Sequence, residues 1–167
     1  MNWYPDLTCH RVSDITLEQL HQWGIRGLIL DIDNTLTTHD NPVPSQGVSQ
    51  WLDQMRQGGI QLMVLSNNKP ERVAPFAGLL GLDFIADGAK PLKGGYRRCA
   101  KAMGLSRQEL GTVGDQLFTD IWGGNRFGCR TILVEPIQLE TMPFFRVKRW
   151  LERRCLAHRC RKGGERL

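Results

Sequence analysis

Gly27-Leu28-Ile29-Leu30-Asp31-Ile32-Asp33-Asn34-Thr35-Leu36 is the stretch of sequence that decides the fold. Its first four residues form a short apolar run, typical of a strand that is buried on both faces of a parallel sheet. The run ends at two aspartates spaced as Asp-x-Asp. Because open α/β sheets bind ligands beyond the carboxyl ends of their strands, the stretch predicts a buried strand that leads into a polar site.

The same pattern continues along the chain, where apolar runs alternate with helix-like segments. Further strands are predicted at residues 60–65, 84–86, 112–113 and 131–134. Between the first two strands, apolar residues recur at helical spacing from Val48 to Met55, and Gly58 is placed to end that helix. Other helices are predicted at residues 72–80 and 92–103, with a short one capped by Ser106 and Glu109. This order is typical of an α/β domain with a parallel sheet of about five strands flanked by helices.

Length and composition restrict the class of protein. The chain has 167 residues, of which 41% are hydrophobic and 23% charged, as expected for one globular domain. No apolar run approaches the roughly 20 residues of a membrane span. Five cysteines are an odd number, which argues against a secreted disulfide framework, and the N-terminus lacks signal-peptide features. A cytoplasmic location is therefore predicted.

The net charge of +5 is unevenly distributed. Residues 144–167 carry nine basic and two acidic side chains, or +7, whereas residues 1–143 carry −2. We expect residues 1–143 to form the core, including an N-terminal helix, and residues 144–167 to form a basic amphipathic helix and tail of the same domain. This helix could pack on the sheet or contact an anionic membrane peripherally. Nucleic acid is the less favoured partner, since Trp150 is the only aromatic residue within the cationic part, which begins at Arg146.

The residues with chemical potential follow the predicted strands. Four carboxylates that converge at one sheet edge would repel each other unless a divalent cation lies among them. Oxygen ligands without a histidine or cysteine cluster favour Mg²⁺, which binds carboxylates together with substrate phosphate oxygens. The predicted metal ligands are Asp31, Asp33, Asp115 and Asp120.

The spacing of the first two aspartates suggests a division of labour in phosphate chemistry. Asp31 could attack phosphorus and form an aspartyl-phosphate, while Asp33 acts as general acid and base. The alternative is that both residues only cap a turn. We expect the phosphoryl group to be bound by Ser66 and Lys90, with further contacts from Asn34, Thr35 and Asn67.

Taken together, these motifs resemble the haloacid dehalogenase (HAD) superfamily of phosphatases. The first motif is residues 31–36, the second is Ser66, the third is Lys90-Pro91, and the fourth runs from Gly114 to Asp120. The resemblance implies a Rossmann-like domain, and it implies the same roles for Asp31, Asp33, Ser66 and Lys90. It also implies that Asp115 binds Mg²⁺, that Asp120 contacts the metal through water or another ligand, and that Asp33 offers it a backbone carbonyl.

The likeness extends over nearly the whole chain to the YqeG-like branch of subfamily IIIA, which is related to the phosphatidylglycerophosphate phosphatases. It is carried by residues 27–36, 65–68, 89–91, 114–128, 131–136 and 149–153. Many members of the superfamily insert a cap domain between the motifs. Here the two gaps, about 30 and about 23 residues, each hold one crossover helix and its loops, so we expect no cap and an open site.

The favoured function is a Mg²⁺-dependent phosphomonoester hydrolase that acts on phosphatidylglycerophosphate or another large or membrane phosphate. One alternative is a phosphatase of soluble phosphomonoesters such as a sugar phosphate, a nucleotide or a phosphoprotein. An alternative of another class is an RNA- or ribosome-associated protein with a vestigial site. His39 is expected as a polar loop residue that could line the mouth of the site.

Overall fold

The structure is a computed structural model that describes residues 3–39 and 41–138. The predicted boundary at residue 143 and the predicted basic helix at residues 144–167 lie outside the described residues. Both therefore stay predictions. Among the described residues, no helix is long and apolar enough to cross a bilayer.

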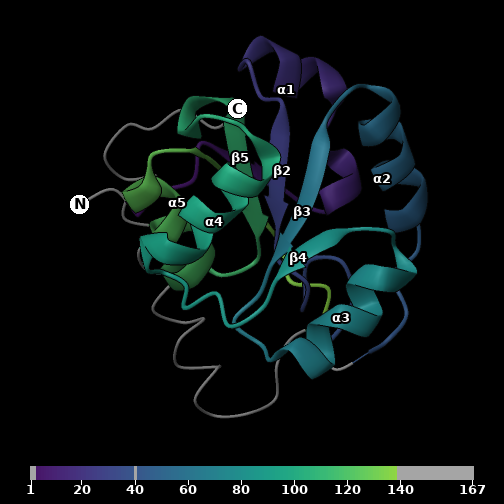
Figure 1. Cartoon of the computed structure of the whole chain (residues 1–167). Helices are drawn as coiled ribbons and strands as arrows, with labels where there is room; N and C mark the ends of the chain where they lie inside the picture. The colour runs from purple at the N-terminus through teal and green to yellow at the C-terminus, as the bar shows by residue number, and fades with distance from the viewer. Residues whose placement is uncertain (1–2, 40, 139–167) are drawn as a thin grey trace, which may run out of the picture.

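Six parallel strands form one sheet in the order β1-β6-β5-β2-β3-β4 (Figure 1). The predicted parallel sheet is confirmed, with one strand more than the five that the apolar runs indicated. The added strand is the short edge strand β1. The strands are β1 Leu7–Cys9, β2 Gly27–Leu30, β3 Gln61–Leu65, β4 Asp83–Ile85, β5 Leu110–Gly114 and β6 Arg130–Val134.

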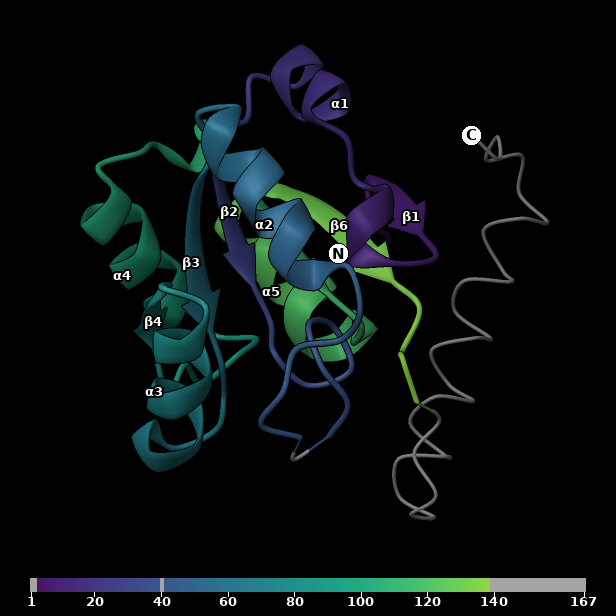
Figure 2. The ribbon, with the colours of Figure 1, turned by 90° about the vertical axis from the view of Figure 1, so that its right-hand side faces the viewer.

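Helices cover both faces of the sheet, as Figures 1 and 2 show from two directions. α2 and α3 lie on one face, and α4 and α5 lie on the other. The helices are α1 Leu17–Gln22, α2 Val48–Gln57, α3 Pro70–Leu79, α4 Lys93–Met103 and α5 Trp122–Phe127. Shorter helical turns are η1 Val12–Asp14, η2 Arg107–Glu109 and the π-helical turn η3 Leu117–Ile121.

β2 lies inside the sheet and is buried on both faces, as its apolar run predicted. Leu28 and Leu30 belong to the cluster that contains Trp51 of α2. Ile29 points to the other face, where it joins a cluster with Tyr96 of α4. Successive strand residues point to opposite faces, so a strand covered on both faces needs an unbroken apolar run.

The first and last strands are tied together at the edge of the sheet. The Asp6 carboxylate accepts hydrogen bonds from the Thr131 backbone N–H at 2.8 Å and from the Thr131 hydroxyl at 3.1 Å. It also pairs with Arg130 at 3.1 Å. Within residues 3–39 and 41–138, β1 pairs with β6 alone, so these contacts fix the strand that the sequence pattern did not reveal.

The two gaps between motifs contain no additional domain in the described part of the chain. After β2, residues 31–39 and 41–60 hold α2 and its loops. After β3, residues 66–92 hold α3, β4 and their connections. The expectation of a domain without a cap is therefore confirmed for these residues.

Candidate active site

Three buried carboxylates meet at the carboxyl end of the sheet. Asp31 follows β2, Asp115 follows the neighbouring β5, and Asp120 lies in η3. One carboxylate oxygen from each lies within 4.8 Å of the others. The register of the two strands brings the first two together, because Leu30 pairs with Val113 and the Asp31 N–H donates to the Val113 carbonyl at 3.0 Å.

Gly114 permits the close approach of Asp120 to the end of β5. A Cβ at this glycine would lie 2.3 Å from the Asp120 Cγ, closer than two carbon atoms can pack. Asp120 is further held by the Gln116 N–H, which donates to its Oδ2 at 3.2 Å. Position 114 therefore requires a glycine, because the Asp120 side chain packs where a Cβ would lie.

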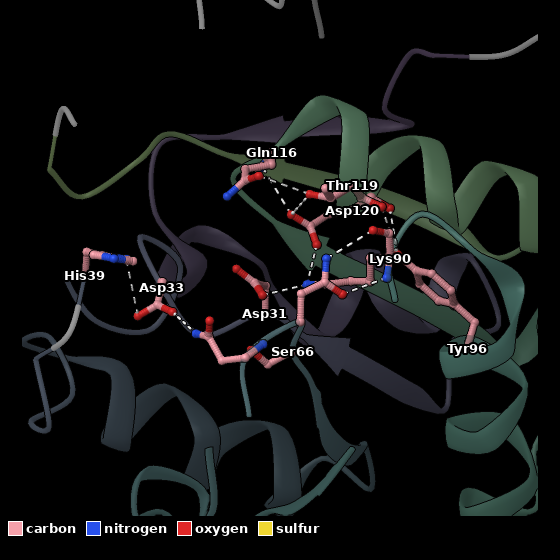
Figure 3. Close-up of polar contacts among 11 residues, drawn as sticks. Asp31, Asp33, His39, Ser66, Lys90, Tyr96, Gln116, Thr119 and Asp120 are labelled. Carbon is pink, nitrogen blue, oxygen red and sulfur yellow. Dashed lines mark hydrogen bonds and ion pairs between the residues drawn. The ribbon is translucent and has the colours of Figure 1, made fainter. Parts of the chain in front are cut away.

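Lys90 supplies the positive charge inside this group of acids (Figure 3). Its Nζ donates to Asp31 Oδ1 and to Asp120 Oδ1, both at 2.6 Å. Burial alone would lower the pKa of Lys90, but the carboxylates of Asp120 and Asp31 outweigh it and raise that pKa above its ordinary value. The side chain is therefore a charged ammonium at neutral pH.

The pKa of Asp31 is strongly perturbed. Burial raises its pKa to about 6, while the charge of Lys90 opposes the rise and that of Asp120 adds to it. The group is still ionised at neutral pH. Perturbed acids held in a cluster of this kind are typical of functional sites rather than of a turn cap.

The carboxylate group fits a divalent cation. Three carboxylates against one ammonium leave a local charge of −2 at a buried site, which a cation of charge +2 would balance. The described residues that form the group offer oxygen ligands without histidine or cysteine, the donor set that favours Mg²⁺ over transition metals. Asp31, Asp115 and Asp120 are the residues that would hold it.

The loop after β3 holds Lys90 in place. The Asn67 side chain donates from Nδ2 to the Lys90 carbonyl at 3.0 Å and accepts from the Lys90 N–H at 2.6 Å. The Ser66 hydroxyl, which is buried beside it, accepts from the Asn68 N–H at 3.1 Å. Asn67 was predicted at the phosphate, and in this structure its amide is engaged with the backbone of the lysine.

Asp33 lies apart from the group of Asp31, Asp115 and Asp120, on the side toward His39 (Figure 3). Its Oδ2 accepts from Asn68 Nδ2 at 2.5 Å, and its Oδ1 accepts from Arg72 Nη2 at 2.9 Å. His39 Nδ1 is 4.0 Å from Asp33 Oδ1. Asp33 was predicted among the metal ligands. In this structure its carboxylate accepts these two hydrogen bonds and lies outside the group of Asp31, Asp115 and Asp120. The contact with a metal through its backbone carbonyl, which the resemblance implies, stays a prediction.

Asn34 and Thr35 belong to the first motif and follow Asp33 in the chain. Asn34 has a left-handed backbone with φ of 60°, and its side-chain oxygen accepts from the Gln138 N–H at 3.2 Å. Thr35 lines a neighbouring cavity of about 260 Å³, and its buried hydroxyl makes no hydrogen bond with any described residue. Both residues were predicted at the phosphate, and that role stays a prediction.

Arg72 is the residue of this site that the sequence did not reveal. It lies in the first turn of α3, 39 positions after Asp33, and nothing in the local pattern distinguishes it from other exposed helix arginines. Only the docking of α3 beside the first motif brings its guanidinium to the aspartate.

Comparison with known proteins adds two kinds of similarity. A family model described as HAD-hydrolase-like matches residues 88–136, the part that contains Lys90, Asp115 and Asp120. The chain is 37% identical over 159 residues to "Probable phosphatase YqeG" of Bacillus subtilis (strain 168), covering 95% of this chain and 92% of that protein. It is 28% identical to "Phosphatidylglycerophosphate phosphatase 1, chloroplastic/mitochondrial" of Arabidopsis thaliana, covering 95% of this chain but 49% of that protein.

Solved structures share the fold. An uncharacterized protein from Listeria monocytogenes serotype 4b superposes with a TM-score of 0.58 at 24% identity, covering 71% of this chain and 85% of that chain. A D,D-heptose 1.7-bisphosphate phosphatase from B. bronchiseptica gives a TM-score of 0.55 at 19% identity, covering 65% and 80%. At these identities the likeness establishes the fold alone.

Proposed function

The chain belongs to the YqeG-like branch of the HAD superfamily, a group of phosphatases, and from this we propose that it hydrolyses phosphomonoesters with Mg²⁺ through an aspartyl-phosphate. The observation that carries the proposal is the buried group of Asp31, Asp115 and Asp120 around the Lys90 ammonium. A site without a function would have no reason to keep three acids together out of water. The RNA-binding alternative with a vestigial site is therefore not favoured.

Mg²⁺ held by Asp31, Asp115 and Asp120 would neutralise and orient the negative oxygens of the phosphoryl group. The remaining charge neutralisation falls to Lys90, whose ammonium lies 2.6 Å from the Asp31 oxygen. The Ser66 hydroxyl is a further donor for the same phosphoryl oxygens. Asn67, through its two hydrogen bonds to the Lys90 backbone, orients the lysine.

The reaction has two steps. In the first, an Asp31 oxygen forms a bond to phosphorus while the bond from phosphorus to the leaving oxygen breaks, and Asp33 donates a proton to that oxygen. In the second, Asp33 takes a proton from a water molecule, whose oxygen attacks phosphorus and breaks the bond to Asp31. Inorganic phosphate leaves, and both aspartates return to their starting states.

The favoured substrate is phosphatidylglycerophosphate or another membrane phosphate. Support comes from the relatives in Arabidopsis thaliana and Chlamydomonas reinhardtii that carry this activity in their names, although the chain spans about half the length of each. Gaps without an inserted domain leave the site open to a bulky leaving group. The predicted cytoplasmic location rests on the cysteine count and the N-terminal sequence, and the peripheral membrane contact rests on residues 144–167. Both stay predictions.

Hydrolysis of p-nitrophenyl phosphate by wild type and Asp31→Asn tests the chemistry. We expect Mg²⁺-dependent activity in wild type and a loss of at least about 1000-fold in the variant, because the nucleophile is removed. Asp53→Asn is the matched control, since Asp53 is exposed on α2 and pairs only with Arg56 among the contacts found. Full activity of Asp31→Asn would contradict the assignment.

The substrate is tested separately. Short-chain phosphatidylglycerophosphate is compared with a panel of sugar phosphates, nucleotides and phosphopeptides at equal concentrations. We expect the highest kcat/KM for the lipid. Rapid turnover of a soluble phosphate without hydrolysis of the lipid would replace the membrane substrate with the soluble class.

A further inference from the structure

Arg72 stands at the boundary between the reaction centre and an apolar groove. On the inner side, its Nη2 donates to Asp33 Oδ1 at 2.9 Å and to the Asn41 carbonyl at 3.3 Å. On the outer side, its guanidinium carbon lies 5.7 Å from the centre of the Phe76 ring. The side chain is 22% exposed, so it is held in place but still accessible to a ligand.

The groove runs between α3 and the loop that precedes α2. Its volume is about 370 Å³, within the range of about 300 to 1,000 Å³ that is usual for small-molecule sites. It is lined by Pro42, Glu71, Arg72, Pro75, Phe76 and Leu79. Apart from the charged residues Glu71 and Arg72 in the first turn of α3, these side chains are apolar.

The loop wall of the groove is ordered by its own hydrogen bonds. The Thr37 hydroxyl donates to the Val43 carbonyl at 2.5 Å, and the Val43 N–H donates to Asn41 Oδ1 at 3.0 Å. On the α3 side of the groove, Leu79 is 63% exposed. An exposed leucine beside the prolines of a groove is typical of a surface that an apolar ligand covers.

The charges around the groove narrow down the ligand. An arginine next to the catalytic aspartate favours a ligand with a second anionic group close to the reacting phosphate. Glu71 lines the same groove and is exposed, which disfavours a ligand that is anionic along its length, such as a nucleic acid. An anion at Arg72 followed by an apolar portion along Pro75 and Leu79 satisfies both conditions.

We propose that Arg72 and the groove beyond it bind the leaving group of an amphiphilic phosphomonoester, with a phosphodiester at Arg72 and the apolar portion against Pro42, Pro75 and Leu79. The inference rests on the proposed phosphatase function and adds to it the residues that select the leaving group. A phospholipid with a terminal monoester phosphate and an internal diester has this chemistry.

Three substrates separate the contributions: dioctanoyl phosphatidylglycerophosphate, the same molecule without its acyl chains, and p-nitrophenyl phosphate. Arg72→Met should lower kcat/KM for both diester substrates at least about tenfold relative to p-nitrophenyl phosphate, since a charge-assisted contact is lost. Arg72→Lys should retain part of this preference. Leu79→Ser should lower the ratio of lipid to deacylated substrate about fivefold, since apolar contact is lost.

Phe84→Ser is the matched control for Leu79→Ser, because Phe84 is an exposed apolar residue of β4 outside the groove lining. It should leave all three ratios unchanged. Ratios measured on one preparation are independent of the fraction of folded protein. A uniform loss on all three substrates in Arg72→Met would mean that Arg72 only positions Asp33, and would overturn the inference.

For Leu79→Ser, an unchanged ratio of lipid to deacylated substrate would show that the apolar portion does not bind in the groove. Both of these failures leave the phosphatase function standing. A wild-type protein that is inactive on all three substrates would instead contradict the proposed function itself, and with it this inference.

Discussion

The side-chain amide of Asn67 forms two hydrogen bonds with the backbone of Lys90, donating to its carbonyl at 3.0 Å and accepting from its N–H at 2.6 Å. The two residues come from the loops after β3 and β4, and this pair of bonds joins those loops. The Lys90 side chain is thereby anchored at its base while its ammonium reaches Asp31 and Asp120.

Asn67→Ala should therefore reduce activity more than its place in a loop suggests. Both hydrogen bonds are lost, and we expect kcat for p-nitrophenyl phosphate to fall by about tenfold, because small misplacements of a catalytic group are costly. Gln54→Ala, an exposed amide of α2, is the control and should behave as wild type. If both variants keep full kcat, the anchor is not needed for catalysis.

Lys90→Met should destabilise the protein in the absence of divalent metal. The variant leaves Asp31 and Asp120 buried without their ammonium partner, a change that costs about 3–5 kcal/mol in comparable buried pairs. Urea unfolding in the presence of a chelator measures the loss. Mg²⁺ should restore more stability to the variant than it adds to wild type, and equal effects on the two proteins would argue against a shared site.

Gly114→Ala should destabilise the protein by displacing Asp120. Its Cβ would lie 2.3 Å from the Asp120 Cγ, so the acid or the strand must move, at a cost of about 1–3 kcal/mol. Gly94→Ala in α4 is the matched control, since nothing lies within 4 Å of its Cβ position. The control should be neutral or stabilised by up to about 1 kcal/mol, as measured by urea unfolding. Equal stabilities would show that Asp120 is not tightly packed.

Glu109 should contribute to the acid dependence of stability. Hydrogen bonds from the Ser106 hydroxyl and backbone, together with Arg26, lower its pKa from 4.5 to about 2. Because the folded-state pKa is below the unfolded one, the stabilisation is complete above about pH 4.5 and is lost as the pH falls toward 2.

Glu109→Gln removes that dependence. Urea unfolding at a series of pH values should give curves for wild type and variant that converge as the pH falls through this window. Curves that stay parallel would show that Glu109 carries no such linkage.

How much the sequence predicts depends on how local the signal is. The buried run of β2 and the helical spacing of α2 are complete within a few residues, so their predictions are confirmed. β1 has three residues and, in the part of the chain that the structure describes, pairs only with β6, far along the sequence, so no periodicity reveals it. α3 begins at Pro70 rather than Arg72 because proline is well tolerated at the first position of a helix.

The site residues also differ in how far a local sequence pattern predicts them. Asp31 and Asp115 come directly after strands, so neighbouring strands bring them together as the pattern predicts. Arg72 reaches Asp33, and Asn67 reaches the backbone of Lys90, through the docking of separate crossovers, and no spacing within the sequence encodes that.

The pairing of β1 with β6 also sets a timetable for synthesis. β1 is made first, yet its partner strand lies about 125 residues later, as do the contacts of Asp6 with Thr131. During translation, β1 therefore cannot pair until β6 has been synthesised, and the edge of the sheet forms only then. In the same way, the carboxylate group cannot form until Asp115 and Asp120 have been synthesised after Asp31. A nascent chain stalled before residue 110 would expose the apolar strand β2 without its β5 neighbour, a surface that a chaperone could cover.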